Sequence, residues 1–173
     1  MVAPLHGFPP VADAGARVLI LGSMPGRASL LADRYYAHER NAFWPILGDL
    51  FGAGPDLPYP QRLAKLQSAG IALWDVIAAC ERPGSLDADI VGDSIQANDF
   101  AAFFAVYRNI DRIFFNGAAA EASFRRYVLP GLAGHALHFA RLPSTSPAHA
   151  ARSYGEKLAD WSVIARLLAA PPA

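Results

Sequence analysis

The sequence predicts an α/β fold, a three-layer α/β/α sandwich around a central, mainly parallel four-stranded sheet. Four short apolar runs have the length and composition of buried strands, and each ends in a turn rich in Gly, Pro, Ser, Asn or Asp. Helix-like segments separate these runs, which favours parallel strands joined by helical crossovers. All four turns should therefore lie along one edge of the sheet, where open α/β proteins build their binding sites.

The predicted strands and helices alternate along most of the chain. The strands cover residues 18–21, 71–74, 113–115 and 136–142. The helices are expected over residues 27–33, 42–51, 61–68, 100–107, 117–127 and 153–168. Asn41 fits an N-cap for the second helix, and Gly70 fits the end of the third.

Length and composition predict a single domain over residues 1–173, with an N-terminal extension over 1–16 and a tail over 169–173. The longest apolar runs are far shorter than the ~20 residues of a membrane helix. The first residues also lack the pattern of a signal peptide. These features predict a cytoplasmic monomer that does not associate with a membrane.

The chain offers no set of residues suited to a metal or cofactor. Its single cysteine, Cys80, excludes an internal disulfide, a cysteine-built zinc site and a cysteine-ligated iron–sulfur cluster. The five histidines show no metal-ligand spacing and are interpreted as surface or turn residues. We therefore expect no metal and no cofactor.

The charge balance argues against a strongly basic, non-specific nucleic-acid binder. The 15 basic and 15 acidic residues give a formal net charge of zero. A local positive patch at the predicted edge remains open, because several arginines fall on or near it. These are Arg27, Arg34, Arg40, Arg82 and Arg152.

An aromatic segment, residues 35–44, stands out after the first predicted helix. The buried start of a helix explains Trp44 well, but it explains Tyr35, Tyr36 and Asn41 poorly. A planar ring ligand needs one aromatic face to stack on and a polar group to hydrogen-bond. The segment therefore indicates a ring-binding site.

Each of the four turns has both a functional and a purely structural interpretation. The glycine-flanked turn Gly22-Ser23-Met24-Pro25-Gly26 can aim its amides at an anion or a carbonyl, yet an ordinary tight turn has the same composition. The segment Pro143-Ser144-Thr145-Ser146-Pro147 suits phosphate oxygens or a capping turn. Asp75 and Asn116 each close a strand, either as ligand contacts or as turn formers.

Taken in order, these motifs resemble those of the uracil-DNA glycosylase superfamily. The matching elements are Gly22-Ser23-Met24-Pro25-Gly26, Tyr35-Tyr36-Ala37-His38, Asn41-Ala42-Phe43-Trp44, Leu73-Trp74-Asp75-Val76-Ile77, Phe115-Asn116-Gly117 and Leu142-Pro143-Ser144-Thr145-Ser146-Pro147-Ala148. They span residues 18 to about 165, and the ordered set is specific although each motif alone is weak. The aromatic segment is similar to that of the mismatch-specific uracil/thymine glycosylases. The serine-rich loop and the first motif look more like those of the hypoxanthine-DNA glycosylases.

The resemblance implies a monofunctional DNA glycosylase of base excision repair. Such an enzyme would flip uracil or hypoxanthine out of double- or single-stranded DNA and hydrolyse its glycosidic bond. Most of the superfamily positions water with an Asp or Asn in the first motif, where this chain has Ser23 and Met24. The catalytic candidates are therefore Asn41, which would orient the water, and Ser23. No Lys lies in the turns to form a Schiff base, which favours hydrolysis without strand cleavage.

The resemblance also assigns the contacts to the base and to the DNA. Phe43 would stack on the flipped ring, and Asp75 would accept the base N–H while an amide donates to the carbonyl. The base-binding candidates are Phe43, Asp75, Asn116, Met24 and Tyr36. The DNA-binding candidates are Ser144, Thr145, Ser146, Ala148, Arg152 and Arg82. The final loop carries no bulky side chain at residues 148–151 to serve as a helix wedge.

Three other functions stay open on the residues. A non-catalytic module could bind nucleotides or sugar phosphates at the same edge. A serine hydrolase could pair Ser23 or Ser144 with a histidine. A degenerate glycosylase could recognise lesions without cleaving them. The sequence does not decide which base is preferred among uracil, hypoxanthine, xanthine and mispaired thymine.

Overall fold

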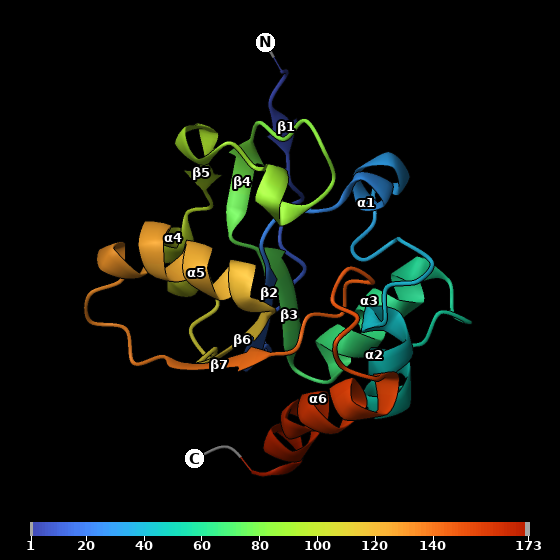
Figure 1. The fold of residues 1–173 in the computed structure, drawn as a ribbon. Helices are drawn as coiled ribbons and strands as arrows, with labels where there is room; N and C mark the ends of the chain where they lie inside the picture. Colours follow the sequence, from blue (N-terminus) through green and yellow to red (C-terminus); the bar gives the residue numbers. More distant parts are fainter. Residues whose placement is uncertain (1, 172–173) are drawn as a thin grey trace.

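The computed structural model describes residues 2–171 and has the predicted α/β architecture (Figure 1). Four parallel strands form the main sheet in the order β3-β2-β6-β7. Their bounds are Val18–Gly22 for β2, Ile71–Asp75 for β3, Arg112–Asn116 for β6 and His138–Leu142 for β7. The register pairs Gly22 with Asp75 and Asn116 with Leu142, so the strands end at one edge, as predicted.

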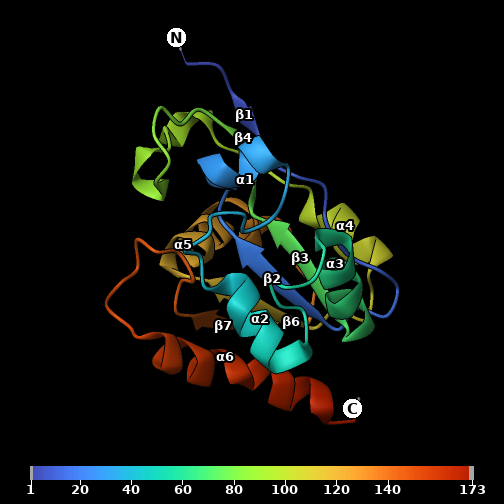
Figure 2. The same ribbon diagram turned by 90° about the vertical axis from the view of Figure 1, so that its right-hand side faces the viewer.

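Helices cover both faces of this sheet, and Figure 2 shows α2 and α3 in front of it. On one side lie α2 (Phe43–Phe51), α3 (Tyr59–Ser68) and α6 (Tyr154–Ala169), and on the other lie α4 (Phe100–Val106) and α5 (Ala118–Tyr127). In β2, Val18 and Ile20 pack with the first group, whereas Leu19 and Leu21 pack with the second. Successive side chains of a strand point to opposite faces, so a strand covered on both faces is apolar throughout.

The predicted helices are all present, with ends shifted by one or two residues. The short α1 spans Arg27–Ala32, between β2 and the aromatic segment. Ser153 caps α6 through its side chain, which accepts a hydrogen bond from the Glu156 N–H. None of the described helices is long and apolar enough to cross a membrane.

The sequence does not predict a second, smaller sheet. Strands β1 (Leu5–His6), β4 (Ile77–Cys80) and β5 (Gln96–Ala97) pair antiparallel in the order β1-β4-β5. Val11 also forms an antiparallel bridge to Leu73 of β3. Within the predicted extension over residues 1–16, residues 5–6 therefore form an edge strand, and Val11 is joined to the main sheet. The predicted tail follows α6, and residues 172–173 lie outside the described part of the chain.

Candidate active site

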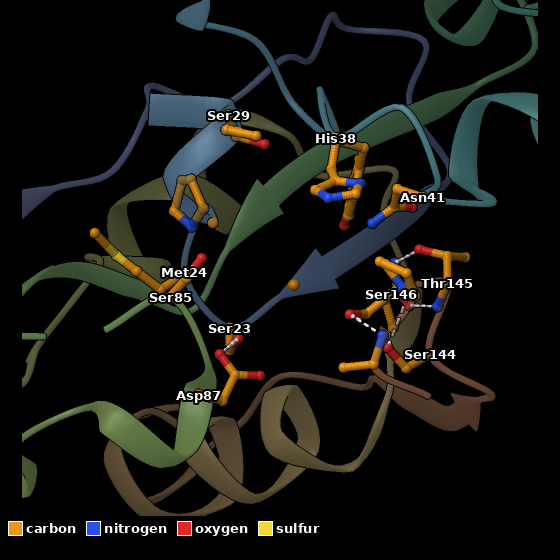
Figure 3. Close-up of a pocket in the computed structure, with 18 of the residues that line it drawn as sticks. Ser23, Met24, Ser29, His38, Asn41, Ser85, Asp87, Ser144, Thr145 and Ser146 are labelled. Carbon is orange, nitrogen blue, oxygen red and sulfur yellow. Dashed lines mark hydrogen bonds between the residues drawn. The ribbon is translucent and has the colours of Figure 1, made fainter. Parts of the chain in front are cut away.

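A cavity of about 550 Å³ lies at the carboxyl ends of the main-sheet strands. Its walls come from the turns after β2, β3, β6 and β7, from the aromatic segment, and from residues 85–87. Figure 3 shows Ser23 and Asp87 on one side of this cavity, Asn41 and His38 on another, and the Ser144–Ser146 loop beside them. The predicted meeting of the four turns is confirmed.

Asp75 provides a buried carboxyl group at the end of β3. It is only 4% exposed, and its Oδ2 has no hydrogen-bond partner among the described residues. Burial, and secondarily the nearby charge of Asp87, raises the pKa of Asp75 to about 7. The neighbouring strand needs Gly22 here, because a Cβ on Gly22 would lie 2.5 Å from Asp75 Oδ1. The cavity thus contains an unpaired carboxyl that is readily neutral near physiological pH.

The aromatic wall is formed by Tyr36, with Phe43 behind it. The two rings stack at a centroid distance of 3.9 Å and an interplanar angle of 21°. Phe43 is fully buried at the start of α2 and does not line the cavity. The assignment of base stacking to Phe43 is therefore corrected, since the ring that lines the cavity is Tyr36.

Tyr36 is held in an unusual conformation. Its backbone has φ of +54°, a left-handed geometry that non-glycine residues rarely adopt. Its hydroxyl is buried and makes no well-formed hydrogen bond among the described residues, although the Asn116 side chain is near enough to lower its pKa. Burial, with the nearby carboxyl of Asp75, raises the pKa of this hydroxyl, which stays protonated. Two residues that line the cavity, Tyr36 and Asp75, thus each carry a buried polar atom without a partner among the described residues.

Asn41 lies directly before α2 and lines the cavity with its side chain. Its Oδ1 accepts a hydrogen bond from the Phe43 N–H at 2.9 Å, which fixes the amide and supports the first turn of the helix. The N-cap of α2 is Ala42 and not Asn41, the residue predicted from the sequence, because α2 begins one residue later, at Phe43. The amide NH₂ is left free of this bond and is the group of Asn41 that can hold a ligand or a water.

The turn after β2 lines the cavity with Ser23 and Met24, as predicted. The Ser23 hydroxyl donates to Asp87 Oδ1 at 2.6 Å, so its partner is a carboxylate. A serine hydrolase would need a histidine in that place. Ser144 Oγ accepts from the Ser146 N–H at 3.2 Å and shows no histidine partner among the described residues. The geometry does not support the hydrolase alternative.

Asn116 and Thr145 bind each other. Asn116 Nδ2 donates to Thr145 Oγ1, and Asn116 Oδ1 accepts from the Thr145 N–H, both at 2.9 Å. Thr145 is 1% exposed, and its carbonyl accepts from the Ala42 N–H at 3.0 Å. These contacts differ from the base-binding role predicted for Asn116 and the DNA-binding role predicted for Thr145. Through these bonds both residues hold the serine loop, residues 143–149, against β6 and α2. Both also line the cavity, and the second N–H of the Asn116 amide is not used in the bonds to Thr145.

The serine loop is further ordered by its own hydroxyls. Ser144 Oγ accepts from the Ser146 N–H, and Ser146 Oγ accepts from the Ala148 N–H, each at 3.2 Å. Both hydroxyl hydrogens stay available to an outside acceptor. The loop packs closely on Gly117, where a Cβ would lie 2.9 Å from Ser144 Cβ. Ser144, Ser146 and the exposed Ala148 line the cavity, and their contact with DNA stays a prediction.

Two arginines predicted to bind DNA are engaged within the protein. Arg82 is 4% exposed, and its guanidinium donates to the carbonyls of Pro25 at 2.8 Å and Gly84 at 3.2 Å. Arg152 forms ion pairs with Asp160 and Glu156 on α6 and does not line the cavity. The burial of Arg82 contradicts a phosphate contact, and Arg152 would have to leave its carboxylates to make one.

Sequence reasoning missed several residues of the site. His38 and His149, interpreted as ordinary surface histidines, line the cavity, and so do Ser85, Leu86 and Asp87. Lys157 of α6 is buried and donates to the His149 carbonyl at 2.7 Å, anchoring the end of the serine loop. Only His38, through the aromatic segment, carried a sequence indication. Among the described residues, no cluster of His, Cys, Asp or Glu is suited to hold a metal ion.

Fold and site together define an α/β protein with a cavity at the carboxyl ends of its parallel strands. Comparisons with known proteins give the family. Residues 9–167 match the model of the uracil DNA glycosylase superfamily. The chain belongs to the uracil DNA glycosylase superfamily, and the predicted enzyme class, a DNA glycosylase that hydrolyses N-glycosyl bonds, is confirmed by the relatives below.

Similar proteins are known from methanogenic archaea. A hypoxanthine DNA glycosylase of Methanosarcina barkeri is 39% identical over 113 residues, covering 65% of this chain and 70% of the relative. A hypoxanthine DNA glycosylase of Methanosarcina acetivorans is 34% identical over 162 residues, covering 93% and 98%. The solution NMR structure of a candidate uracil DNA glycosylase from M. acetivorans superposes with a TM-score of 0.80 at 32% identity, covering 97% of this chain and 100% of that one.

Proposed function

We propose that this chain releases a deaminated base, hypoxanthine first and uracil second, from DNA by flipping the nucleotide into the cavity and hydrolysing its N-glycosidic bond. The names of the two similar archaeal enzymes support hypoxanthine. Flipping is required because the glycosidic bond is not accessible within a stacked duplex, and it costs least for a mispaired base. The reaction belongs to DNA repair in the cytoplasm and needs a single copy of the chain, no metal and no cofactor.

The observation that carries this proposal is the unpaired carboxyl of Asp75 in the cavity. A neutral carboxyl has one O–H donor and one carbonyl acceptor. Hypoxanthine and uracil both present a lactam edge, a carbonyl beside an N–H, which pairs with such a group through two hydrogen bonds. A burial-raised pKa of about 7 keeps a large share of Asp75 in this neutral form. Backbone amides of the turn after β2 would supply a further donor to the carbonyl.

A flipped base would stack on Tyr36, which lines the cavity with Phe43 stacked behind it. Aromatic stacking of a base contributes ~1–3 kcal/mol and tolerates different ring systems. This role replaces the one that the sequence assigns to Phe43. Met24, from the opposite turn, would bound the remaining edge of the ring.

Departure of the base is helped by the same carboxyl. As the glycosidic bond breaks, negative charge accumulates on the base and on its carbonyl oxygen. A neutral Asp75 donates a hydrogen bond to that oxygen, whereas an ionised Asp75 would repel it. The NH₂ group of Asn41 would hold the attacking water, and no strong base is required because the leaving anion is already stabilised.

The test is base release from end-labelled duplexes and single strands, each carrying one hypoxanthine, uracil, xanthine or mispaired thymine. Alkali converts each abasic product into a strand break. We expect release of hypoxanthine and uracil, with hypoxanthine fastest. Tight binding of these duplexes without release would contradict catalysis and favour a lesion-binding module.

The products also report on the mechanism. We expect an intact strand before alkali treatment, because the residues lining the cavity include no lysine that could form a Schiff base. Borohydride present during the reaction should therefore trap no covalent protein–DNA adduct. A trapped adduct would show a lyase mechanism and overturn the monofunctional assignment.

A further inference from the structure

Residues 81–89 bring a second carboxylate to the cavity from the side of β4. Three hydrogen bonds fasten this segment to the turn after β2. Arg82 donates to the Pro25 carbonyl at 2.8 Å, the Ser23 hydroxyl donates to Asp87 Oδ1 at 2.6 Å, and the Arg27 N–H donates to Ser85 Oγ at 3.2 Å. Asp87 begins the short 3₁₀ helix η1 (Asp87–Asp89), and Figure 3 shows its carboxylate hydrogen-bonded to Ser23.

The Asp87 carboxylate acts on the interior of the cavity. Its charge contributes to raising the pKa of Asp75 and the pKa of Tyr36, after the larger effect of burial in both cases. Among the described residues only its Oδ1 has a hydrogen-bond partner, Ser23, and the exposed residue lines the cavity. Arg82, in the same segment, is buried. Its Nε and Nη2 donate to carbonyl groups, and its Nη1 has no partner among the described residues.

The proposed reaction creates a positive charge on the deoxyribose. None of the residues that the proposed function uses provides a negative charge to stabilise it. The bond between C1′ and the base nitrogen breaks, and its electron pair leaves with the base. C1′ and the ring oxygen share the positive charge until the oxygen of a water bonds to C1′ and its proton passes to solvent. Asn41 is a neutral amide, and a neutral Asp75 serves the leaving base. Neither can stabilise a cation on the sugar by its charge.

We propose that Asp87 stabilises the positive charge on the deoxyribose during bond cleavage, and that Ser23 is the positioning residue which fixes its carboxylate. This inference rests on the proposed glycosylase function. Figure 3 places Asp87 and Asn41 at different sides of the cavity, so the sugar would lie between the charge and the water. A fixed charge needs no reorganisation as the cation forms, which makes it effective in a partly enclosed site.

The charge can be tested in a binding experiment that involves no bond cleavage. Two duplexes are compared, one with a cationic pyrrolidine and one with a neutral tetrahydrofuran in place of the damaged nucleoside. We expect the wild-type protein to bind the pyrrolidine duplex on the order of 10²-fold more tightly, as mimics of a transition-state charge do. Asp87→Asn should reduce this preference to within a few-fold of unity, and Ser23→Ala should reduce it partly.

Asp89→Asn is the matched control. It removes the same charge from the same turn, and asparagine can still accept the hydrogen bond that Asp89 Oδ2 receives from the Leu86 N–H at 3.2 Å. We expect Asp89→Asn to keep the full preference for pyrrolidine. An equal loss in both variants would show a general effect of negative charge and overturn the assignment to Asp87.

Single-turnover rates of hypoxanthine release separate this inference from the proposed function. We expect Asp87→Asn to lose about 10²-fold in rate while binding the tetrahydrofuran duplex as the wild type does. If the wild type releases no base, the proposed function fails. If the wild type releases base and Asp87→Asn is equally fast, the function stands and the role of Asp87 is refuted.

Discussion

Two regions of the cavity differ in how their polar groups are hydrogen-bonded. One is the floor, formed by Asp75 and Tyr36, and the other is the serine loop. On the floor, Asp75 Oδ2 and the Tyr36 hydroxyl are buried without a partner among the described residues. In the loop, Thr145 is bound on three sides, by both ends of the Asn116 amide and by the Ala42 N–H. One region leaves hydrogen bonds unmade, whereas the other uses its backbone and side chains to fix itself.

This difference indicates what each region is for. An unpaired buried polar group costs ~1–3 kcal/mol, so it persists where a ligand recovers the loss. A loop whose hydrogen bonds are already satisfied loses little further entropy when it binds. The floor is therefore suited to recognise a base that enters from outside, and the serine loop is suited to receive a DNA backbone without rearranging.

The largest effect is expected at Asn41, between these two regions. Asn41→Ala should slow single-turnover base release by on the order of 10²-fold or more, because the amide that holds the water is lost. Binding to a duplex that cannot be cleaved should stay close to that of the wild type. The measurement is a rate with enzyme in excess, together with fluorescence anisotropy on a tetrahydrofuran duplex.

Asn41→Ser distinguishes two roles of Asn41, holding the water and supporting the first turn of α2. Serine keeps an oxygen that can accept from the Phe43 N–H, as Asn41 Oδ1 does at 2.9 Å, but it lacks the NH₂ group. We expect Asn41→Ser to regain the thermal stability that Asn41→Ala loses, but not the single-turnover rate of base release. Recovery of both would show that Asn41 acts through the start of α2 and would move the water elsewhere.

The next effect concerns the protonation of Asp75. Its folded-state pKa is raised to about 7, so the neutral form that assists the leaving base predominates below pH 7 and is lost above it. The single-turnover rate should therefore fall as the pH rises through 7, approaching tenfold per pH unit. A rate that stays constant between pH 6 and 9 would contradict this role.

Asp75→Asn sharpens the test, because asparagine presents a donor and an acceptor at every pH. We expect this variant to release hypoxanthine with a pH profile that no longer falls above 7. If it retains the wild-type decline, the decline belongs to another group, and Asp75 serves only to bind the base.

The sequence predicts where the floor of the cavity lies better than it predicts which side chains form it. The apolar run 18–21 and Asp75 after 71–74 follow from strand composition and from the rule that parallel strands end together. That Tyr36 and not Phe43 lines the cavity could not be predicted from the sequence. The position of the Tyr36 ring depends on its left-handed backbone, with φ of +54°, which no local pattern indicates. Asp87 is equally hidden, since its partner Ser23 is 64 residues away and its segment has no periodic pattern.

The serine loop shows the same limit. Its composition indicates hydroxyls presented after a strand, and Ser144 and Ser146 do line the cavity. Asn116 binds Thr145, which lies 29 residues further along the chain, and no local sequence pattern indicates this pairing. Residues 5–6 form a strand too short for alternation to be recognised, and they are ordered by β4.

A smaller effect is expected when the unmade hydrogen bond of Tyr36 is removed. Tyr36→Phe keeps the ring stacked on Phe43 and deletes the unpaired hydroxyl. The free energy of unfolding should rise by about 1 kcal/mol, measured by urea denaturation. Base release should be retained if the ring face alone supports the base. A less stable Tyr36→Phe variant would show that the hydroxyl has a partner in solution.

The smallest effect is expected in the serine loop. Replacing both Ser144 and Ser146 by Ala should weaken DNA binding by about fivefold, because each hydroxyl offers one exposed hydrogen bond to a phosphate. The loss should be the same for hypoxanthine and uracil duplexes, since phosphate contacts carry no base information. Ser162→Ala is the matched control, because Ser162 is partly exposed on α6, away from the cavity. Its hydroxyl donates to the Ala159 carbonyl and accepts from the Arg166 guanidinium.

The salt dependence of DNA binding tests whether the affinity lost in the double variant comes from contacts to phosphates. The chain has no net charge, and Arg82 and Arg152 are engaged by the protein itself, so few phosphates can be neutralised. The logarithm of affinity should fall with the logarithm of salt concentration with a slope of roughly −2 to −4. Neutral hydroxyls release no counterions, so the double variant should bind more weakly with an unchanged slope. If the double variant instead alters the preference between hypoxanthine and uracil, the serine loop contacts the base, and the contrast between floor and loop does not hold.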